Sequence, residues 1–329
     1  MKNTVIFSDA LTALKTLPDD LVQVVVTSPP YWAMRDYDNH RQWFDESRDP
    51  CAHDLSVEHG PHHPGQVEET KWKKAEGAGK GQTALTHSCS KCGAWYGQLG
   101  QEPELRGYIK HMVEIFREVR RVLRVDGSMW LNLGDTFKDK RLQLVPYLVA
   151  TALQEDGWLL RSVVQWHKIS AKPESVRDRP VRSHEPIFLM TKSEKYFYDH
   201  EAVKEPTADE EGLRSMRDVW SFAYKPLTRV KYEREANFAV FPTELPKRCI
   251  KASSRKGDLV LDIFAGSGTT LGVAKSLGRD YLGIEVNSSY SNLIERRIDS
   301  LGGSLPMDLF DEMGSMSMAE VMAKTPSSA

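Results

Sequence analysis

The chain has 329 residues, of which 40% are hydrophobic and 27% charged, values that suit a globular protein with one large core. Its formal net charge of -2 gives no overall attraction to polyanions, so any surface for nucleic acid must be local. No apolar run reaches the roughly 20 residues that cross a bilayer, and the N-terminus lacks the pattern of a signal peptide. We therefore expect a cytoplasmic protein without membrane contact.

The order of apolar and polar residues predicts strands that alternate with helices. Two β-branched runs, 22–27 and 259–264, are followed at once by proline or glycine, as buried parallel strands are. An Asp126-Gly127 turn separates a helix from the strand after it. This alternation predicts a doubly wound α/β sheet. The expected helices are 108–123, 142–155 and 270–277, and the expected strands are 22–27, 128–133, 158–166, 259–264 and 281–286.

Three stretches interrupt this alternation and divide the chain. Residues 39–103 are polar and rich in histidine and glycine, and residues 202–236 are charged with scattered aromatic side chains. Residues 306–329 are rich in methionine and serine, and we expect them to form a flexible tail. The remaining segments are expected to form a single core, namely residues 1–38, 104–201 and 237–305.

A glycine-rich turn follows the second apolar run, in Val260-Leu-Asp-Ile-Phe-Ala-Gly-Ser-Gly-Thr-Thr270. Gly266 and Gly268 would let the backbone approach a ligand closely, although such a pair is also typical of a plain tight turn. Glu285 ends the next strand about 20 residues downstream, where a carboxylate can accept hydrogen bonds from ribose hydroxyls. No lysine follows the second glycine, so the pattern favours a nucleoside cofactor over a triphosphate.

The first apolar run ends in Ser28-Pro29-Pro30-Tyr31. Both prolines lack an N–H and have a fixed φ, so they hold the carbonyls of Ser28 and Pro29 outward. A planar amino group needs such acceptors to orient its nitrogen lone pair, and Tyr31 offers a face on which a base can stack. The alternative is a rigid loop with aromatic packing. We interpret the turn as a site for methylation of an amine.

Two motifs resemble a known family. Val-Thr-Ser-Pro-Pro-Tyr at 26–31 resembles the signature of cytosine-N4-specific DNA methyltransferases, and Phe264-Ala-Gly-Ser-Gly268 resembles the cofactor loop of the wider amino-methyltransferase family. The order of the motifs is that of the permuted β-class. The resemblance implies a Rossmann-like class I methyltransferase fold with a mixed sheet, S-adenosylmethionine as cofactor and duplex DNA as substrate. It also implies base flipping and direct displacement, with Ser28, Pro29, Pro30 and Tyr31 as catalytic residues.

The resemblance extends to the cofactor pocket. Asp9 resembles the acidic position that contacts the adenine of the cofactor, and residues 237–250 are similar to the segment around its methionine moiety. Cys249 in this segment is not preceded by proline, so we expect a core residue and not a nucleophile. The residues expected to bind the cofactor are Asp9, Phe241, Pro242, Asp262, Phe264, Ala265, Gly266, Gly268, Thr269 and Glu285.

Basic residues concentrate in one loop-rich region, which resembles the family's stretch near the target-base pocket. Such a cluster can track phosphates, although a solvated basic face is the competing interpretation. The segment 202–236 is expected to read the DNA sequence, with a contribution from the polar insert. The residues expected to contact DNA are Lys168, Lys172, Arg177, Arg179 and Arg182.

The insert 39–103 carries two close pairs of metal-type side chains. Cys51 and His53 form one pair, and Cys89 and Cys92 form the other, in a C-x-x-C-G turn typical of zinc knuckles. A structural zinc ion would replace the apolar core that this polar insert lacks. His87 could substitute for His53, and coincidental surface cysteines are the alternative. A catalytic zinc ion is not expected, because methyl transfer needs no activated water.

The motifs are compatible with four functions to different degrees. A cytosine-N4 DNA methyltransferase leads, followed by an adenine-N6 enzyme of the same architecture. A zinc-bearing DNA-binding protein on an inactive fold is disfavoured because both motifs are intact. An RNA methyltransferase is disfavoured because no RNA-binding module is found. A restriction–modification role fits the leading interpretation, and a homodimer is left open.

Overall fold

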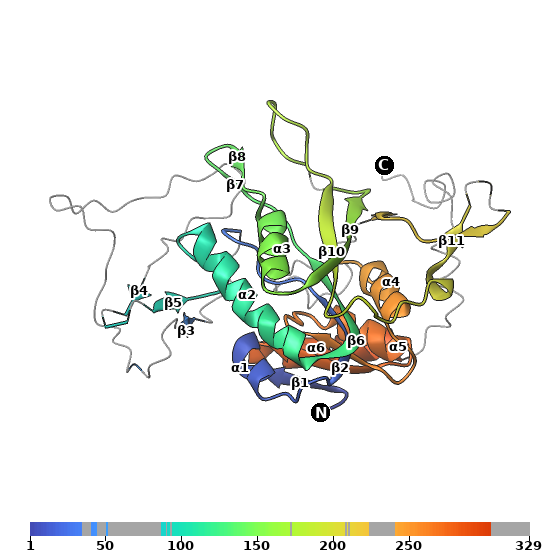
Figure 1. The fold of residues 1–329 in the computed structure, drawn as a ribbon. Coiled ribbons are helices and arrows are strands. Elements are labelled where there is room, and N and C mark those ends of the chain that lie inside the picture. Colours follow the sequence, from blue (N-terminus) through green and yellow to red (C-terminus); the bar gives the residue numbers. More distant parts are fainter. Residues whose placement is uncertain are drawn as a thin grey trace.

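The computed structural model describes residues 1–34, 41–44, 51, 87–89, 91–92, 94–171, 173–207, 209, 211–223 and 241–303. An eight-stranded sheet forms the centre of the molecule (Figure 1). Its strands follow the order β1 (Thr4–Phe7), β15 (Asp280–Glu285), β14 (Leu259–Asp262), β2 (Val22–Thr27), β6 (Leu123–Asn132), β10 (His184–Thr191), β9 (Leu159–Lys168) and β13 (Val219–Phe222).

Strand direction makes this a mixed sheet. Five neighbouring strands are parallel to one another, namely β1, β15, β14, β2 and β6. Strand β10 is antiparallel to both of its neighbours, and β13 is parallel to β9. All six residues of β2 are buried, as expected of a β-branched strand covered on both faces. The predicted doubly wound α/β fold is confirmed.

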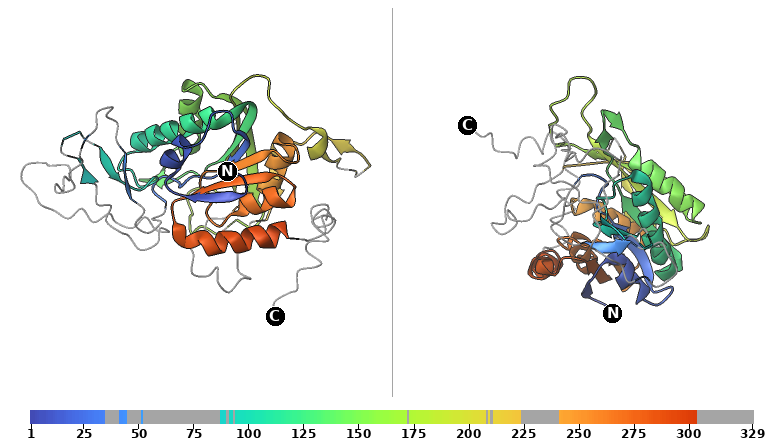
Figure 2. Two further views of the ribbon diagram at one scale, coloured as in Figure 1. Left: turned by 90° about the horizontal axis from the view of Figure 1, so that it is seen from below. Right: turned by 90° about the vertical axis from the view of Figure 1, so that its left-hand side faces the viewer.

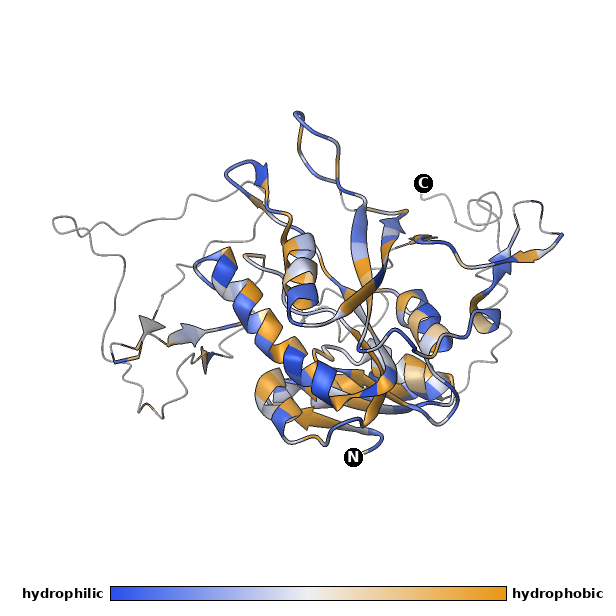
Figure 3. Ribbon diagram, viewed as in Figure 1, coloured by the Kyte–Doolittle hydropathy of each residue, from blue (hydrophilic) through white to orange (hydrophobic). Residues whose placement is uncertain are grey.

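Helices cover the two faces of the sheet in separate layers. Val25 of β2 packs with residues of the first three helices, whereas Val24 and Val26 pack with α4 and α5 on the opposite face. Figures 1 and 2 show the two layers, and Figure 3 shows apolar and polar residues alternating around α2. The first layer contains α1 (Ala10–Lys15), α2 (Leu105–Val122) and α3 (Val145–Glu155), and the second contains α4 (Glu244–Ser253), α5 (Thr269–Ser276) and α6 (Ser291–Gly302).

The expected helices and strands are present, with different ends. The expected turn at Asp126-Gly127 is an irregularity inside β6. Leu123 pairs with Val22 and Ser128 pairs with Val24, so the residues between them on β6 shift the register. The helix expected from residue 142 begins at Val145, after Leu144 in the left-handed conformation. Residues 141–142 instead form β8 (Arg141–Leu142), which pairs with β7 (Phe137–Lys138).

The segments outside the expected core are only partly described. Strands β11 (Glu205–Pro206) and β12 (Leu213–Arg214) form a small hairpin, whereas β13 joins the main sheet with Trp220 fully buried. A part of the stretch 202–236 therefore belongs to the core. The expected tail 306–329 lies outside the described residues. In the part of the chain that the structure describes, no helix is long and apolar enough to span a membrane.

The insert contributes a second, three-stranded sheet. It consists of β3 (Gln42–Phe44), β5 (Trp95–Gly97) and β4 (His87–Ser88), with β5 in the middle and antiparallel to both neighbours. The connection from β5 leads directly into α2 (Figure 1). Two short 3-10 helices, Glu201–Val203 and Ser288–Tyr290, complete the described elements.

Candidate active site

Two segments far apart in the sequence leave the sheet side by side. Strands β2 and β14 are parallel neighbours, so both end at the same edge of the sheet. Their last residues are joined directly, because the Thr27 hydroxyl donates to Asp262 Oδ1 at 2.7 Å. The Ser-Pro-Pro-Tyr turn (residues 28–31) and the glycine loop (residues 264–268) therefore begin next to each other.

Asp262 forms hydrogen bonds with β2, the glycine loop and α5 at this edge. Its carboxylate accepts hydrogen bonds from the hydroxyls of Thr27 and Thr270, both at 2.7 Å, and from the Phe264 N–H at 3.1 Å. Burial raises the pKa of this carboxyl group, against the lowering effect of the three hydrogen bonds. Because the side chain is only 2% exposed, the structure supports a role in holding the loop. Its expected contact with the cofactor stays a prediction.

The glycine loop depends on backbone conformations that favour glycine. Gly266 and Gly268 have φ values of +52° and +82°, in the left-handed region. Gly268 also precedes α5, and a Cβ there would lie 3.0 Å from Cγ2 of Ile294 on α6. The loop therefore brings the N-terminus of α5 to the sheet edge and leaves its backbone open to a close ligand.

The two predicted carboxylates lie at the ends of neighbouring strands. Glu285 Oε2 accepts the Gly266 N–H at 2.7 Å and Oε1 accepts the Asn287 N–H at 3.0 Å. Burial raises the pKa of Glu285, partly offset by these hydrogen bonds. Asp9 caps the N-terminus of α1, where its side chain accepts the Thr12 N–H at 2.9 Å. Since the Ser8 N–H donates to the Glu285 carbonyl, the structure brings the two acidic residues to one edge.

The remaining predicted cofactor residues reach the same edge. Ala265 and Thr269 are buried within the loop and the first turn of α5, and Phe264 packs partly against the core. Phe241 and Pro242 precede α4, and a short connection joins the other end of α4 to the start of β14. The N-terminus of α4 therefore lies at the carboxyl edge of the sheet. Residues 237–240 of this segment lie outside the described residues.

The Ser-Pro-Pro-Tyr turn is supported from the side of α2. The Tyr108 hydroxyl donates to the Pro30 carbonyl at 2.9 Å. Gly100 packs so closely that a Cβ there would lie 3.0 Å from the Tyr31 carbonyl oxygen. Within the described part of the chain, no hydrogen bond is donated to the carbonyl of Ser28 or Pro29. These two acceptors are the ones that the sequence predicts for a substrate amine.

The Tyr31 ring is held at both its edge and its face. Its hydroxyl oxygen lies 3.2 Å from Ser28 Oγ, from Asn132 Oδ1 and from Glu185 Oε2. A Cβ on Gly134 would lie 2.3 Å from Tyr31 Cε2, so only glycine fits there. Asn132, Gly134 and Glu185 are contacts of Tyr31 that the sequence did not single out. The one signal was that Glu185 lies in the stretch resembling the base-pocket segment.

Several of the basic residues expected to contact DNA form ion pairs with acidic residues of the chain itself. Lys168 pairs with Glu185, the same carboxylate that contacts Tyr31. Arg179 pairs with Glu174 at 2.8 Å, and Arg182 lies 3.7 Å from that carboxylate and donates to the Asp135 carbonyl. Arg177 is exposed, and Lys172 lies outside the described residues. The contacts of these residues with DNA phosphates stay predictions. The ion pairs partly neutralise the positive charge of this surface.

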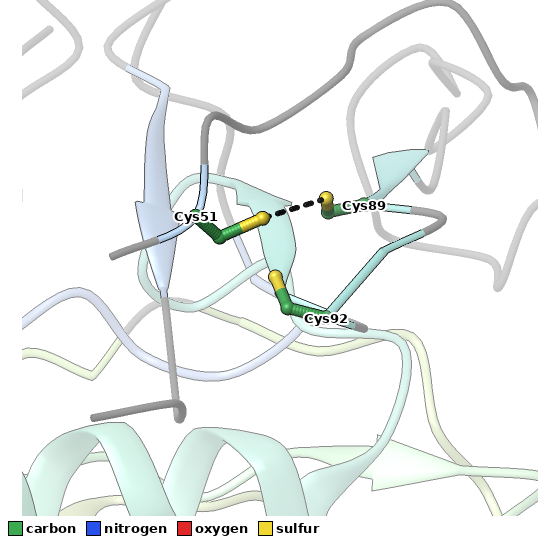
Figure 4. A group of neighbouring side chains, drawn as sticks. All are labelled: Cys51, Cys89 and Cys92. Atoms are coloured by element: carbon green, nitrogen blue, oxygen red, sulfur yellow. Dashed lines mark hydrogen bonds between the residues drawn. The ribbon is translucent and has the colours of Figure 1, made fainter. Parts of the chain in front are cut away.

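Three of the four cysteines lie together in the insert. The side chains of Cys51, Cys89 and Cys92 point toward one another (Figure 4), with all three sulfurs within 4.8 Å of one another. Desolvation and hydrogen bonding to Cys92 and Cys89 raise the pKa of the Cys51 thiol to about 11. The predicted partner His53 lies outside the described residues. Cys249 is buried in α4 and burial raises its pKa, which agrees with the expected core residue.

The chain resembles known proteins over most of its length. The family model described as DNA methylase (N6_N4_Mtase) matches residues 22–296. The type II methyltransferase M.XycI of Xanthomonas campestris pv. cyanopsidis is 37% identical over 90% of this chain and 87% of its own length. The type II methyltransferase M.SmaI of Serratia marcescens is 35% identical, over 89% of this chain and 90% of its own.

A solved structure agrees on the fold. The PvuII DNA methyltransferase, described as cytosine-N4-specific, superposes with a TM-score of 0.62, covering 98% of this chain and 91% of its own. The identity of 17% limits this likeness to the fold. The family model and the two relatives show that the chain also shares the family's activity. The chain belongs to the N6/N4 family of DNA methylases and is a DNA methyltransferase.

Proposed function

We propose that the enzyme transfers a methyl group from S-adenosylmethionine to the N4 amine of cytosine in duplex DNA. One observation carries the proposal: the Ser-Pro-Pro-Tyr turn and the glycine loop leave adjacent parallel strands at one edge, joined by the bond from Thr27 to Asp262. A base amine and a nucleoside cofactor bound at these two segments would meet in the crevice above that edge.

The glycine-loop side is proposed to hold the cofactor. Gly266 and Gly268 allow close approach of the backbone, Glu285 would accept the ribose hydroxyls, and Asp9 would contact the adenine. Phe241 and Pro242 would pack around the methionine moiety. When bound, S-adenosylmethionine supplies a methyl group on a positively charged sulfur, which makes that carbon electrophilic. The two carboxylates Asp9 and Glu285 suit a site for a cationic ligand.

The turn side is proposed to hold the base. A cytosine flipped out of the duplex would stack on Tyr31, whose ring is already fixed by Ser28, Asn132 and Gly134. The carbonyls of Ser28 and Pro29 would accept hydrogen bonds from the two N–H groups of the amine and direct the nitrogen lone pair outward. They would also stabilise the positive charge that grows on nitrogen as the N–C bond forms and the C–S bond breaks. One amine proton is lost afterwards.

Cytosine is favoured over adenine by the residue before the two prolines. Position 28 is a serine, as in the cytosine-N4 signature that residues 26–31 resemble, and its hydroxyl donates to Tyr31. The adenine-N6 alternative uses the same architecture. Mass spectrometry of nucleosides from DNA of expressing cells tests the choice. N4-methylcytosine above the level in cells expressing Tyr31→Ala supports the proposal, and N6-methyladenine alone would contradict it.

DNA contacts and a second cofactor complete the proposal. Arg177, Arg179, Arg182, Lys168 and Lys172 would follow the phosphates, while polar segments including 202–236 would read the sequence. A structural zinc ion at Cys51, Cys89 and Cys92 is the second cofactor. This zinc takes no chemical part, because displacement at a sulfonium methyl needs no activated water.

A further inference from the structure

The three cysteines converge at one end of the small sheet β3-β5-β4. Cys51 follows β3, Cys89 follows β4 and Cys92 precedes β5, and Trp95 at the start of β5 pairs with the last residue of each neighbouring strand. The strands have three, two and three residues. So few strand residues bury little surface on their own, so a cross-link at this end would stabilise the sheet.

The spacing of the sulfurs fits a metal ion. Sulfurs bound to one tetrahedral zinc ion, at about 2.3 Å from the metal, lie about 3.8 Å apart. Cys51 Sγ and Cys89 Sγ are 3.8 Å apart, and Cys92 Sγ lies within 4.8 Å of both. A disulfide needs a sulfur–sulfur distance of about 2.05 Å, and none of these three cysteines forms a disulfide. Three thiolates leave one position of the ion for a fourth ligand.

The sheet in turn covers a histidine on α2. Phe44 of β3 stacks on His111 with ring centroids 4.1 Å apart, and Trp95 of β5 lies parallel to the same ring at 5.8 Å, with 9° between the planes. Phe44 and Trp95 also stack on each other at 5.3 Å. The end of the sheet that carries the cysteines is therefore connected, through the stacked rings of Phe44 and Trp95, to His111.

His111 is linked to the Ser-Pro-Pro-Tyr turn through one buried carboxylate. His111 Nδ1 lies 2.9 Å from Glu102 Oε1, and both side chains are almost fully buried. Glu102 Oε2 accepts the Gly100 N–H at 2.8 Å, and the Glu102 carbonyl accepts the Trp32 indole N–H at 2.9 Å.

Gly100 is the last link. Its carbonyl accepts the Ala33 N–H at 2.7 Å, and its α-carbon packs against Pro30 and the Tyr31 carbonyl. The hydrogen bonds of Glu102 therefore help to position the backbone around Tyr31, together with the bond from Tyr108 to the Pro30 carbonyl. Opening the small sheet would expose His111 and Glu102 to water and weaken those bonds.

We infer that zinc bound by Cys51, Cys89 and Cys92 positions the catalytic turn, through the aromatic stack, His111 and Glu102. Methyl transfer then depends on the metal although the metal touches no reactant, because a displacement of about 1 Å at a reacting group can slow a reaction about a hundredfold. Cofactor binding does not depend on the metal, since the glycine loop, Asp9 and Glu285 lie at the ends of β14, β1 and β15, away from the small sheet. The kinetic part of this inference rests on the proposed function.

The metal is tested first, by elemental analysis of the full-length protein from zinc-replete cells. We expect about one zinc per chain in the wild type and none in the double variant C89S/C92S. C249A is the matched control, because it removes the one cysteine outside the cluster, and it is expected to retain zinc. A wild type without zinc, or a double variant with full zinc content, would overturn the metal site.

The link to the turn is tested by amide hydrogen exchange, which needs no activity. In C89S/C92S we expect residues 28–34 and 98–104 to exchange at least about tenfold faster, with β14 and α5 unchanged. Glu102→Gln cuts the link but keeps the cysteines, so it should retain zinc and still show faster exchange at 28–34. Wild-type protection of the turn in both variants would overturn the positioning role, whatever the enzyme's substrate.

Kinetics then connect the turn to catalysis. Single-turnover methylation should fall at least about tenfold in both C89S/C92S and Glu102→Gln, while the Kd for S-adenosylmethionine changes less than about twofold. Cys92→His, which replaces one zinc ligand by another, should restore zinc and most of the rate. Unchanged rates in the zinc-free variant would overturn the inference. If the wild type itself does not methylate cytosine, the proposed function fails, while the metal and exchange results still decide the site.

Discussion

The two halves of the active site are built in different ways. The glycine-loop half is mainly local: Asp262, Phe264, Gly266 and Glu285 lie close together in the chain, and the N–H groups of Phe264 and Gly266 donate to the carboxylates of Asp262 and Glu285. The turn half is assembled from α2, β6, β10 and the insert, which approach Tyr31 from separate parts of the chain. A local site can form with its own sheet, whereas an assembled site depends on every element that supports it.

The largest effect is expected at Tyr31. Tyr31→Ala removes the stacking surface for the flipped base, so single-turnover methylation should fall at least about a hundredfold while cofactor affinity stays near wild type. Tyr147→Ala, which changes an exposed tyrosine on α3, is the matched control. A wild-type rate in Tyr31→Ala would reduce the turn to a structural loop.

Gly134→Ala tests the packing of the same ring without removing it. The added Cβ would lie 2.3 Å from the Tyr31 ring, so the ring must move and the rate should fall roughly tenfold to a hundredfold. Gly107→Ala is the control, because a Cβ there meets only ordinary contacts at 3.7 Å. Equal rates in the two variants would show that the position of the ring is not critical.

Glu285→Ala tests the local half. Losing a charged hydrogen bond should weaken S-adenosylmethionine binding by roughly 1–3 kcal/mol in calorimetry, with a smaller effect on the rate at saturating cofactor. Glu295→Ala on the exposed side of α6 serves as control. Unchanged affinity would remove Glu285 from the cofactor site.

The smallest effect is a dependence on pH. Burial raises the pKa of Glu285, so this carboxylate takes up a proton at a higher pH than an exposed glutamate does. Because only the ionised form accepts hydrogen bonds at both oxygens, cofactor affinity should fall as the pH is lowered through that pKa. Glu285→Gln should bind more weakly and lose this dependence. An identical pH profile in the variant would assign the titration to another group.

The same contrast explains what the sequence could predict. The apolar periodicity located the strands and helices around the site, and the glycine loop with Glu285 was visible because its parts lie close together in the chain. Asn132, Gly134 and Glu185 were missed, because their contact with Tyr31 requires knowing that β6 and β10 follow β2 in the sheet. The pair of His111 on α2 and Glu102 just before that helix was missed for the same reason, since the two side chains become notable only once the fold buries them together.

A crystal structure would show whether the turn holds the base while the glycine loop holds the cofactor. The complex would contain duplex DNA with its recognition site and the demethylated cofactor S-adenosylhomocysteine. We expect a flipped cytosine stacked on Tyr31, with its N4 amine hydrogen-bonded to the carbonyls of Ser28 and Pro29 and facing the cofactor sulfur. A target base whose amine is bound away from those carbonyls, or a cofactor away from the glycine loop, would contradict it.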